Sequence, residues 1–256
     1  MTRRSISKQC KILKLGHIPH VYPEIAYKNK EQYLTELLQV EIEGRQANRV
    51  KNLIKRAGFP VHKVLENFDW QPVTLPESTS ISDLSDLSFL EEKDNVLSLG
   101  AVGTGKTHLA IALGLRACME GKRVCFYQCL DLVNELLENH RQDNLAKLLE
   151  RLKKAHLIII DELGFVPLHQ NGAELLFNVV AQAYERQSLI VTSNLQFGQW
   201  NSVLGDDRLT AALIDRLVHH AHILAFDGPS YRLKQALSTI PDCSKSPFGE
   251  MREGKE

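Results

Sequence analysis

The chain has 256 residues, 43% of them apolar, and its 31 Lys and Arg residues balance 31 Asp and Glu residues. This composition is typical of a globular protein with one large domain, or one domain and a small appendage. The apolar runs are far shorter than the about 18 residues that a membrane-spanning helix needs, and the N-terminus lacks the apolar core of a secretory signal. The five cysteines lack the paired spacing of a metal site. We therefore expect a reduced cytoplasmic protein without a membrane partner.

The N-terminal segment differs from the rest of the chain in charge. Residues 1–70 hold 13 basic and 7 acidic side chains, so their net charge is +6 and that of the remainder is −6. Such a split predicts a basic module for which nucleic acid is one partner, although solvated helix faces are an alternative. From Lys30 to Ala57 apolar residues recur every three or four positions, which predicts helical structure with Gly44 as its interior breaker.

Prolines and a polar run mark residues 58–86 as a connector, so we place a domain boundary near residue 70. Beyond it, short apolar runs alternate with segments of helical length, which predicts an α/β fold with a parallel sheet covered by helices on both faces. The runs are Val96–Leu99, Val124–Tyr127, Leu157–Ile160, Leu189–Thr192 and His222–Phe226. The expected organisation is a helical N-terminal module (1–70), an α/β domain (71–237) and a polar C-terminal tail (238–256).

The first apolar run leads into GAVGTGKT, residues 100–107, which fits the pattern G-x-x-x-x-G-K-[ST] between a strand and a helix. Glycines let such a loop bring backbone N–H groups onto phosphate oxygens at a helix N-terminus. Lys106 can reach the β- and γ-phosphates of a nucleotide, and the Thr107 hydroxyl can ligate Mg²⁺. A chance Gly-rich turn is the alternative, but the flanking strand and helix favour nucleotide binding.

An adjacent pair of carboxylates follows the run Leu157–Ile160, 55 residues beyond Lys106. At the end of a buried strand, Asp161 is placed to hold Mg²⁺ through water, and Glu162 can act as general base toward an attacking water. The alternative is that Asp161 and Glu162 are simply polar residues where a strand leads into a loop. The phosphate loop earlier in the chain favours the catalytic interpretation. The glutamate also argues for water as the phosphoryl acceptor rather than the acceptor substrate of a kinase.

Two further residues are candidates for the same site. Asn194 follows the next run at the carboxyl edge of the predicted sheet, where ligands bind in open parallel sheets, and it can orient the water or sense the γ-phosphate. Arg216 lies on a predicted helix before the last strand. Its spacing leaves two roles open: an ion pair within the chain, with Asp215 for example, or an arginine finger supplied to a neighbouring subunit's γ-phosphate.

Taken in order, five segments resemble the IstB-type transposition helper ATPases of bacterial insertion sequences, which belong to the AAA+ superfamily and are related to the DnaC and DnaI helicase loaders. The segments are GTGKTHLA, LIIIDELGF, TSN, DRLTAALIDRLVHHAHIL and SYR, and the resemblance covers most of residues 60–234. The chain departs from the usual phosphate loop, since Ala101 and Val102 stand where members have prolines. The glycines, Lys106 and Thr107 are kept, so we expect nucleotide binding to survive.

The resemblance implies a P-loop AAA+ ATPase core whose five-stranded parallel sheet has the order 5-1-4-3-2. It also implies ATP hydrolysis with Mg²⁺, self-association into an oligomer on duplex DNA, and assistance to a transposase of the same insertion sequence in target selection and activation. The implied catalytic residues are Lys106, Glu162, Asn194 and Arg216. The implied nucleotide-binding residues are Gly100, Gly103, Thr104, Gly105, Lys106, Thr107, His108 and Arg232, and the implied Mg²⁺ ligands are Thr107 and Asp161.

Three alternatives stay open. A helicase loader has the same ATPase core but a helicase as partner, a small-molecule kinase acts as a monomer, and a protein that binds ATP without hydrolysing it is disfavoured by Glu162. The basic N-terminal module lacks a zinc-ligand set and favours direct contact with the phosphate backbone of DNA. Its basic residues include Arg3, Arg4, Lys8, Lys11, Lys14, Lys51, Lys55 and Arg56. Whether Arg208 shares the finger role of Arg216 or only fixes the helix is also open.

Overall fold

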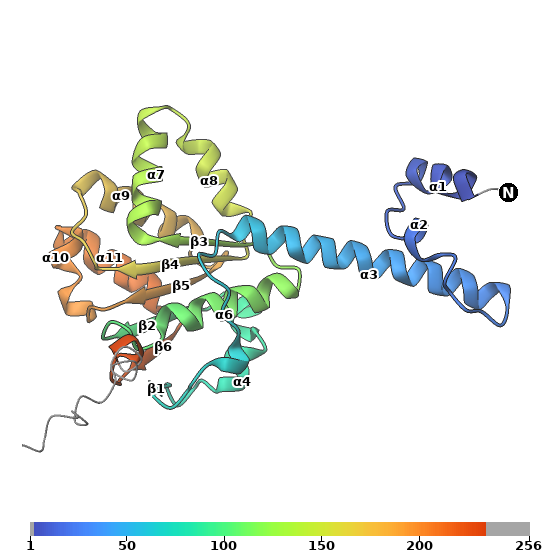
Figure 1. Cartoon of the computed structure of the whole chain (residues 1–256). Coiled ribbons are helices and arrows are strands. Elements are labelled where there is room, and N and C mark those ends of the chain that lie inside the picture. The colour runs from blue at the N-terminus through green and yellow to red at the C-terminus, as the bar shows by residue number, and fades with distance from the viewer. Residues whose placement is uncertain (1–2, 234–256) are drawn as a thin grey trace, which may run out of the picture.

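The computed structural model describes residues 3–233, which form an α/β domain with a long helical arm (Figure 1). Five parallel strands coincide with the five predicted runs, and numbered along the chain they take the expected order 5-1-4-3-2. They are β2 (Asn95–Gly100), β3 (Val124–Gln128), β4 (Leu157–Leu163), β5 (Ser188–Ser193) and β6 (Ala221–Phe226). The predicted tail, residues 238–256, lies outside the described residues.

The prediction of a five-stranded sheet was one strand short. A two-residue strand, β1 (Val73–Thr74), pairs antiparallel with β6 and gives the order β1-β6-β2-β5-β4-β3. Because β1 is so short and lies in the proline-rich connector, it lacks the apolar run that marks the other strands.

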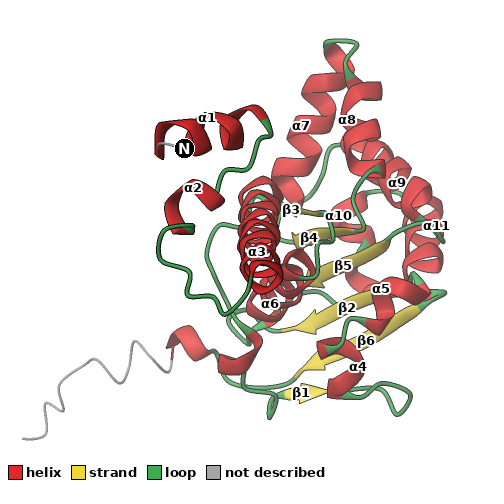
Figure 2. Ribbon diagram, turned by 90° about the vertical axis from the view of Figure 1, so that its right-hand side faces the viewer, coloured by secondary structure: helices red, strands yellow, loops and turns green. Residues whose placement is uncertain are grey.

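Helices cover both faces of the sheet, as Figure 2 shows. One face carries α4 (Ile81–Ser85), α5 (Ser88–Glu92), α6 (Lys106–Met119) and the end of α3 (Lys30–Ala57). The other carries α7 (Cys129–Arg141), α8 (Leu145–Lys153), α9 (Gln170–Ala183), α10 (Asn201–Leu204) and α11 (Asp207–Val218). Two short 3₁₀ helices span Leu65–Asn67 and Phe197–Gln199. Within the described part of the chain, none of the helices is both long and apolar enough to span a membrane.

Alternation of side chains along β4 explains why its sequence is continuously apolar. Ile158 and Ile160 pack into the core on one face, and Leu157 and Ile159 pack into the core on the other. Since helices cover both faces, the four positions of this strand before Asp161 are all apolar. The parallel arrangement brings the carboxyl ends of β2, β4 and β5 to one edge of the sheet.

The helical arm consists of α3 and two short helices, α1 (Arg3–Ile12) and α2 (Ile18–Val21); α2 packs on the outer part of α3, and α1 packs on α2 (Figure 1). Gly44 does not break α3, contrary to the prediction. A Cβ atom at Gly44 would lie 2.3 Å from the Cγ atom of His17, so this glycine makes room for the segment before α2. The inner end of α3 packs on β3 and α6. The domain boundary near residue 70 stays a prediction.

Glu41 on α3 holds the segment that leads into α2. Its buried carboxylate accepts hydrogen bonds from the backbone N–H groups of Gly16 (3.1 Å) and His17 (2.8 Å) and from the Arg45 Nε atom (2.8 Å). Burial raises the pKa of Glu41, but the hydrogen bonds from Arg45 and from the backbone outweigh this effect and lower the pKa from 4.5 to about 2. The ionised carboxylate is therefore what fastens this segment to α3.

We expect Glu41→Gln to loosen the α1–α2 segment at neutral pH, and acid to do the same to the wild type. A carboxyl whose folded pKa is depressed contributes stability that is fully present above its unfolded pKa, and that stability is lost as the pH falls toward the folded value of about 2. Hydrogen exchange at Gly16, His17 and Ile18 between pH 7 and pH 2 measures this loss. Equal protection of the variant and the wild type at pH 7 would contradict the prediction.

Candidate nucleotide site

The loop between β2 and α6 closes tightly because two of its glycines approach other segments. Gly100 and Gly103 have φ angles of 146° and 82°, in the left-handed region that favours glycine. A Cβ atom would lie 2.3 Å from the backbone oxygen of Phe226 at Gly100, and 2.2 Å from the Ser230 Oγ atom at Gly103. Backbone conformation thus favours glycine at both positions, and at Gly100 space requires it as well, because the near atom there belongs to the backbone.

The side chain of Lys106 turns back into this loop. Lys106 is 8% exposed, and its ammonium group donates hydrogen bonds to the carbonyl oxygens of Gly100 (2.7 Å) and Ala101 (2.6 Å). Burial lowers the pKa of Lys106, whereas the nearby carboxylates of Asp161 and Glu162 act to raise it. A buried ammonium group at a helix N-terminus fits the phosphate oxygens of a nucleotide.

Asp161 connects the phosphate loop to the neighbouring strand. Its buried Oδ1 atom accepts hydrogen bonds from the hydroxyls of Thr107 (2.9 Å) and Thr192 (2.6 Å). Burial raises the pKa of Asp161, and these hydrogen bonds together with Lys106 offset only part of that effect. Hydroxyl and carboxylate oxygens are the hard ligands that Mg²⁺ prefers, so the chemistry of the Thr107–Asp161 pair fits this ion.

Glu162 occupies an irregular position where β4 leaves its regular pairing with β5. The register shifts between Ile160 and Leu163, and Glu162 has a φ angle of 60°. Its backbone N–H donates to the Thr192 Oγ1 atom at 2.9 Å, so a hydroxyl of β5 holds the bulge in place. Such a conformation costs a non-glycine residue on the order of 1 kcal/mol and is typical of functional sites.

One cavity of about 360 Å³ at the carboxyl edge of the sheet brings most of the candidate residues together. Those that line it are Gly103, Thr104, Gly105, Lys106, Thr107, His108, Glu162, Asn194 and Arg232. Gly100 and Asp161 are joined to them through hydrogen bonds to Lys106 and Thr107. Segments far apart in the chain therefore meet at a single cavity.

Arg216 is the exception among the candidates. Arg216 is not among the described residues that line the cavity. Its guanidinium group donates to the carbonyl oxygen of Ala212 at 3.1 Å and lies over the ring of Phe177, 4.6 Å from its centroid. Arg208, on the same helix, is exposed. Within one chain, Arg216 thus lies apart from the phosphate loop.

Other walls of the cavity come from residues to which the sequence assigned no role. Residues 61–69 of the connector contribute Val61, Lys63, Asn67, Phe68 and Asp69, and other elements add Val102, Ile111, Phe165, Thr192 and Tyr231. The ring of Phe68 packs edge-on against His108, with 5.3 Å between centroids. Residues 61–69 carry no motif. Thr192 did have a signal, since it is a hydroxyl residue at the end of a buried strand.

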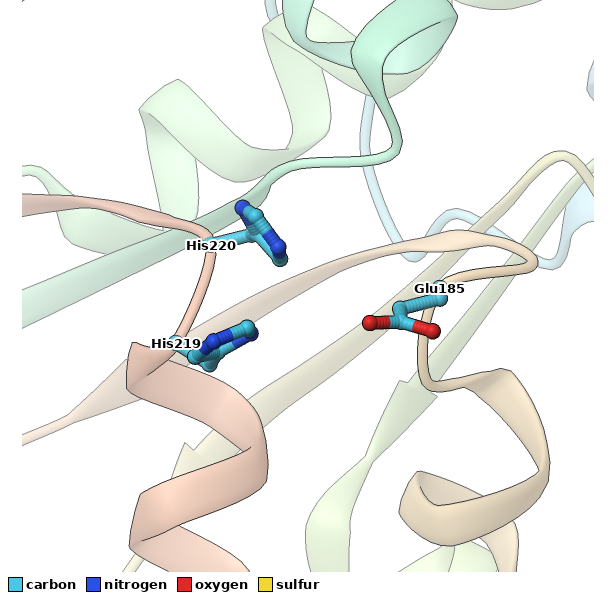
Figure 3. Close-up of side chains that lie close together, drawn as sticks. All are labelled: Glu185, His219 and His220. Atoms are coloured by element: carbon cyan, nitrogen blue, oxygen red, sulfur yellow. The ribbon is translucent and has the colours of Figure 1, made fainter.

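A separate group of metal-ligand side chains lies at the opposite edge of the sheet (Figure 3). One ligand atom each from Glu185, His219 and His220 lies within 4.8 Å of the others, and all three residues are exposed. They precede β5 and β6, so they flank the amino ends of these strands. This group is therefore distinct from the predicted Mg²⁺ ligands Thr107 and Asp161.

Comparison with known proteins identifies the family. Residues 9–239 match the family model described as IstB-like ATP binding protein. The chain is 40% identical over 204 residues to a Geobacillus stearothermophilus protein named for ATP binding and insertion sequence IS5376, a match that covers 80% of this chain and 81% of that protein. It is 37% identical over 221 residues to the corresponding IS21 protein of Pseudomonas aeruginosa, covering 86% and 83%.

Solved structures share the fold at lower identity. AMPPCP-bound DnaA from Aquifex aeolicus superposes with a TM-score of 0.52 at 22% identity, covering 76% of this chain and 58% of that one. A DnaI structure gives a TM-score of 0.50 at 15% identity, covering 70% and 92%. These similarities confirm the predicted α/β fold class. On the family match and the identity to its relatives, the chain belongs to the IstB-like ATP-binding protein family.

Proposed function

We propose that this chain is an ATP-hydrolysing helper of transposition. In this proposal it binds ATP with Mg²⁺, self-associates on duplex DNA, and assists the transposase of the same insertion sequence in target selection and activation. The observation that carries the proposal is the convergence of the phosphate loop, Asp161 and Glu162 at one cavity. Relatives named for ATP binding and insertion sequences supply the biological setting.

The residues of the cavity divide the chemistry of hydrolysis among them. Lys106 and the loop N–H groups bind the β- and γ-phosphates, and Thr107 and Asp161 would hold Mg²⁺, which neutralises phosphate charge when bound. Glu162 takes a proton from water as the water oxygen attacks the γ-phosphorus and the bond to ADP breaks. Asn194, on the cavity wall, orients this water or senses the γ-phosphate. The products are ADP and inorganic phosphate.

Thr192 is a positioning residue in this scheme, and we expect Thr192→Val to lower kcat for ATP hydrolysis about ten- to a hundredfold. Its hydroxyl donates to Asp161 and accepts the N–H of Glu162, so the variant leaves buried polar groups unpaired at a cost of about 1–3 kcal/mol. Steady-state ATPase rates and binding of fluorescent ATP separate kcat from affinity, which we expect to change only a few-fold. Thr192→Ser keeps the hydroxyl and is the matched control; a valine variant with normal kcat would refute the role.

The proposed function is tested by binding to labelled duplex and single-stranded DNA at one stated salt concentration. Fluorescence anisotropy is measured without nucleotide, with ADP and with a non-hydrolysable ATP analogue. We expect cooperative binding to duplex DNA with the analogue, and we expect Lys106→Ala to abolish the effect of the analogue. Failure to bind duplex DNA in any state, or a preference for single strands, would instead favour a helicase loader.

The alternatives have weaker support. A helicase loader has the same ATPase core, but the likeness to DnaI is one of fold alone at 15% identity. A small-molecule kinase is expected to act as a monomer. Native mass measured with and without the ATP analogue tests this point, because a monomer in both states would contradict the proposed self-association.

A further inference from the structure

A basic cleft lies between α3 and the ATPase core, beside the place where the inner end of α3 packs on the core. It has a volume of about 730 Å³. Its basic side chains are Arg45, Arg49 and Arg56 from α3 and Arg123 from the core, and His156 of the core also lines it. Arg123 directly precedes β3 and His156 directly precedes β4. The basic cleft therefore lies at the amino edge of the sheet, whereas the nucleotide cavity lies at the carboxyl edge.

The arginines of α3 form a row that faces the core. Arg45, Arg49 and Arg56 are spaced four and seven positions apart, which places them on one side of a helix. The guanidinium group of Arg49 lies over the turn before β3, since a Cβ atom at Gly121 would be 3.8 Å from the Arg49 Cζ atom. Two segments distant in sequence thus bring their arginines to one cleft.

The positive charge of the basic cleft is largely uncompensated. Arg45 pairs with Glu41, but Arg49, Arg56 and Arg123 form no ion pair with any of the residues 3–233 that the structure describes. Burial lowers the pKa of His156, and the neighbouring cations, Arg123 first among them, lower it further. Converging like charges without acidic partners attract a polyanion.

We propose that the basic cleft receives the phosphate backbone of duplex DNA through Arg49, Arg56 and Arg123. The inference rests on the proposed function and names its DNA-contacting surface. The guanidinium fork binds phosphate bidentately, and the rise from Arg49 to Arg56, about 10 Å, matches roughly three base-pair steps. Phosphate contacts carry no sequence information, so this surface contributes affinity rather than target choice.

The basic residues that the sequence placed in one N-terminal module line different surfaces in the structure. Arg56 lines the basic cleft, whereas Lys51 and Lys55 line a separate hollow with Met119. Arg123 and His156 belong to the ATPase core and were not among the basic residues singled out from the sequence. The proposed DNA surface is thus shared by the arm and the core rather than confined to the N-terminal module.

The test replaces Arg49, Arg56 and Arg123 together by glutamine in the full chain. Anisotropy with labelled duplex DNA and the ATP analogue is measured over a range of salt concentrations. Each lost phosphate contact removes about 0.9 from the slope of log K against log salt, so we expect a slope shallower by about 2 to 3 and an affinity at least about tenfold weaker. The loss should be equal for unrelated DNA sequences.

Two control variants make the outcome specific. Glutamine at Arg141, Lys147 and Arg186 removes the same charge from exposed positions outside the basic cleft and should leave the slope within about 0.5 of the wild type. Lysine at the three cleft positions keeps the charge and should retain most of the slope. Binding of fluorescent ATP should be unchanged in every variant, because the nucleotide cavity lies at the other edge of the sheet.

The outcomes separate the inference from the function on which it rests. Suppose that the wild type binds duplex DNA and that the cleft variant binds it with the same affinity and the same salt dependence. This result would overturn the inference that the basic cleft contacts DNA, but it would leave the proposed function standing. An equal loss in the charge-matched control would also overturn it, since net charge alone would then explain the effect. A wild type that binds no duplex DNA in any nucleotide state would remove the proposed function itself.

Discussion

Arg216→Ala is expected to abolish ATP turnover, by about 10³- to 10⁵-fold, while ATP affinity stays within about twofold of the wild type. In its own chain the Arg216 guanidinium group is held by the Ala212 carbonyl and the Phe177 ring, apart from the phosphate loop. Its loss should therefore leave the chain's own nucleotide contacts intact. We expect the effect on turnover to arise in a neighbouring subunit, to which Arg216 would supply a positive charge that stabilises the transition state.

The intramolecular alternative has less support. Adjacent residues on a helix point in different directions, and Arg216 forms no ion pair with Asp215 or any other carboxylate in the described part of the chain. Burial of the stacked guanidinium is partial, so its charge remains available at the surface of α11. These observations favour a finger that acts between subunits.

A mixing experiment distinguishes the two roles. Lys106→Ala lacks the phosphate-binding lysine but keeps Arg216, and Arg216→Ala keeps the complete phosphate loop. Each variant alone should be inactive, but a mixture should regain part of the ATPase rate at interfaces that combine the intact halves. Arg208→Ala, a change on the same helix, shows whether the finger role is shared. Normal hydrolysis by Arg216→Ala would refute the assignment.

The parts of the site that could be predicted from sequence are those whose chemistry is local. The phosphate loop needs glycines, Lys106 and Thr107 within eight residues, and a strand and helix on either side are visible as apolar runs. Asp161 and Glu162 follow the four apolar residues of a doubly buried strand, near its carboxyl end. The order of the strands could not be predicted in this way, because an apolar run does not indicate which strand it pairs with. The order 5-1-4-3-2 was predicted from the resemblance to the family.

The remaining parts depend on contacts between distant segments. Phe68 reaches the cavity because residues 58–70 pass over α6, and no local sequence pattern predicts this path. The bulge at Glu162 depends on the hydroxyl of Thr192, a residue of another strand. The basic cleft likewise exists only when α3 lies against the turn at Arg123. Spacing along the chain cannot give such relations, since each requires the tertiary arrangement.

Glu162→Gln is expected to lower kcat for ATP hydrolysis by about 10²- to 10⁴-fold while ATP still binds. The amide has nearly the size of the carboxylate but cannot accept the proton of the attacking water. The bulge should persist, because Thr192 holds the backbone N–H of residue 162 and not its side chain. Single-turnover hydrolysis measures the chemical step, and binding of fluorescent ATP shows that the site is intact.

The same variant links hydrolysis to DNA binding. With ordinary ATP, Glu162→Gln should hold duplex DNA as the wild type does with the non-hydrolysable analogue, because its bound ATP persists. If neither the wild type nor the variant hydrolyses ATP, the chain binds ATP without hydrolysing it. If both hydrolyse ATP rapidly, another group is the base, and the strained position of Glu162 beside the phosphate loop needs a different explanation.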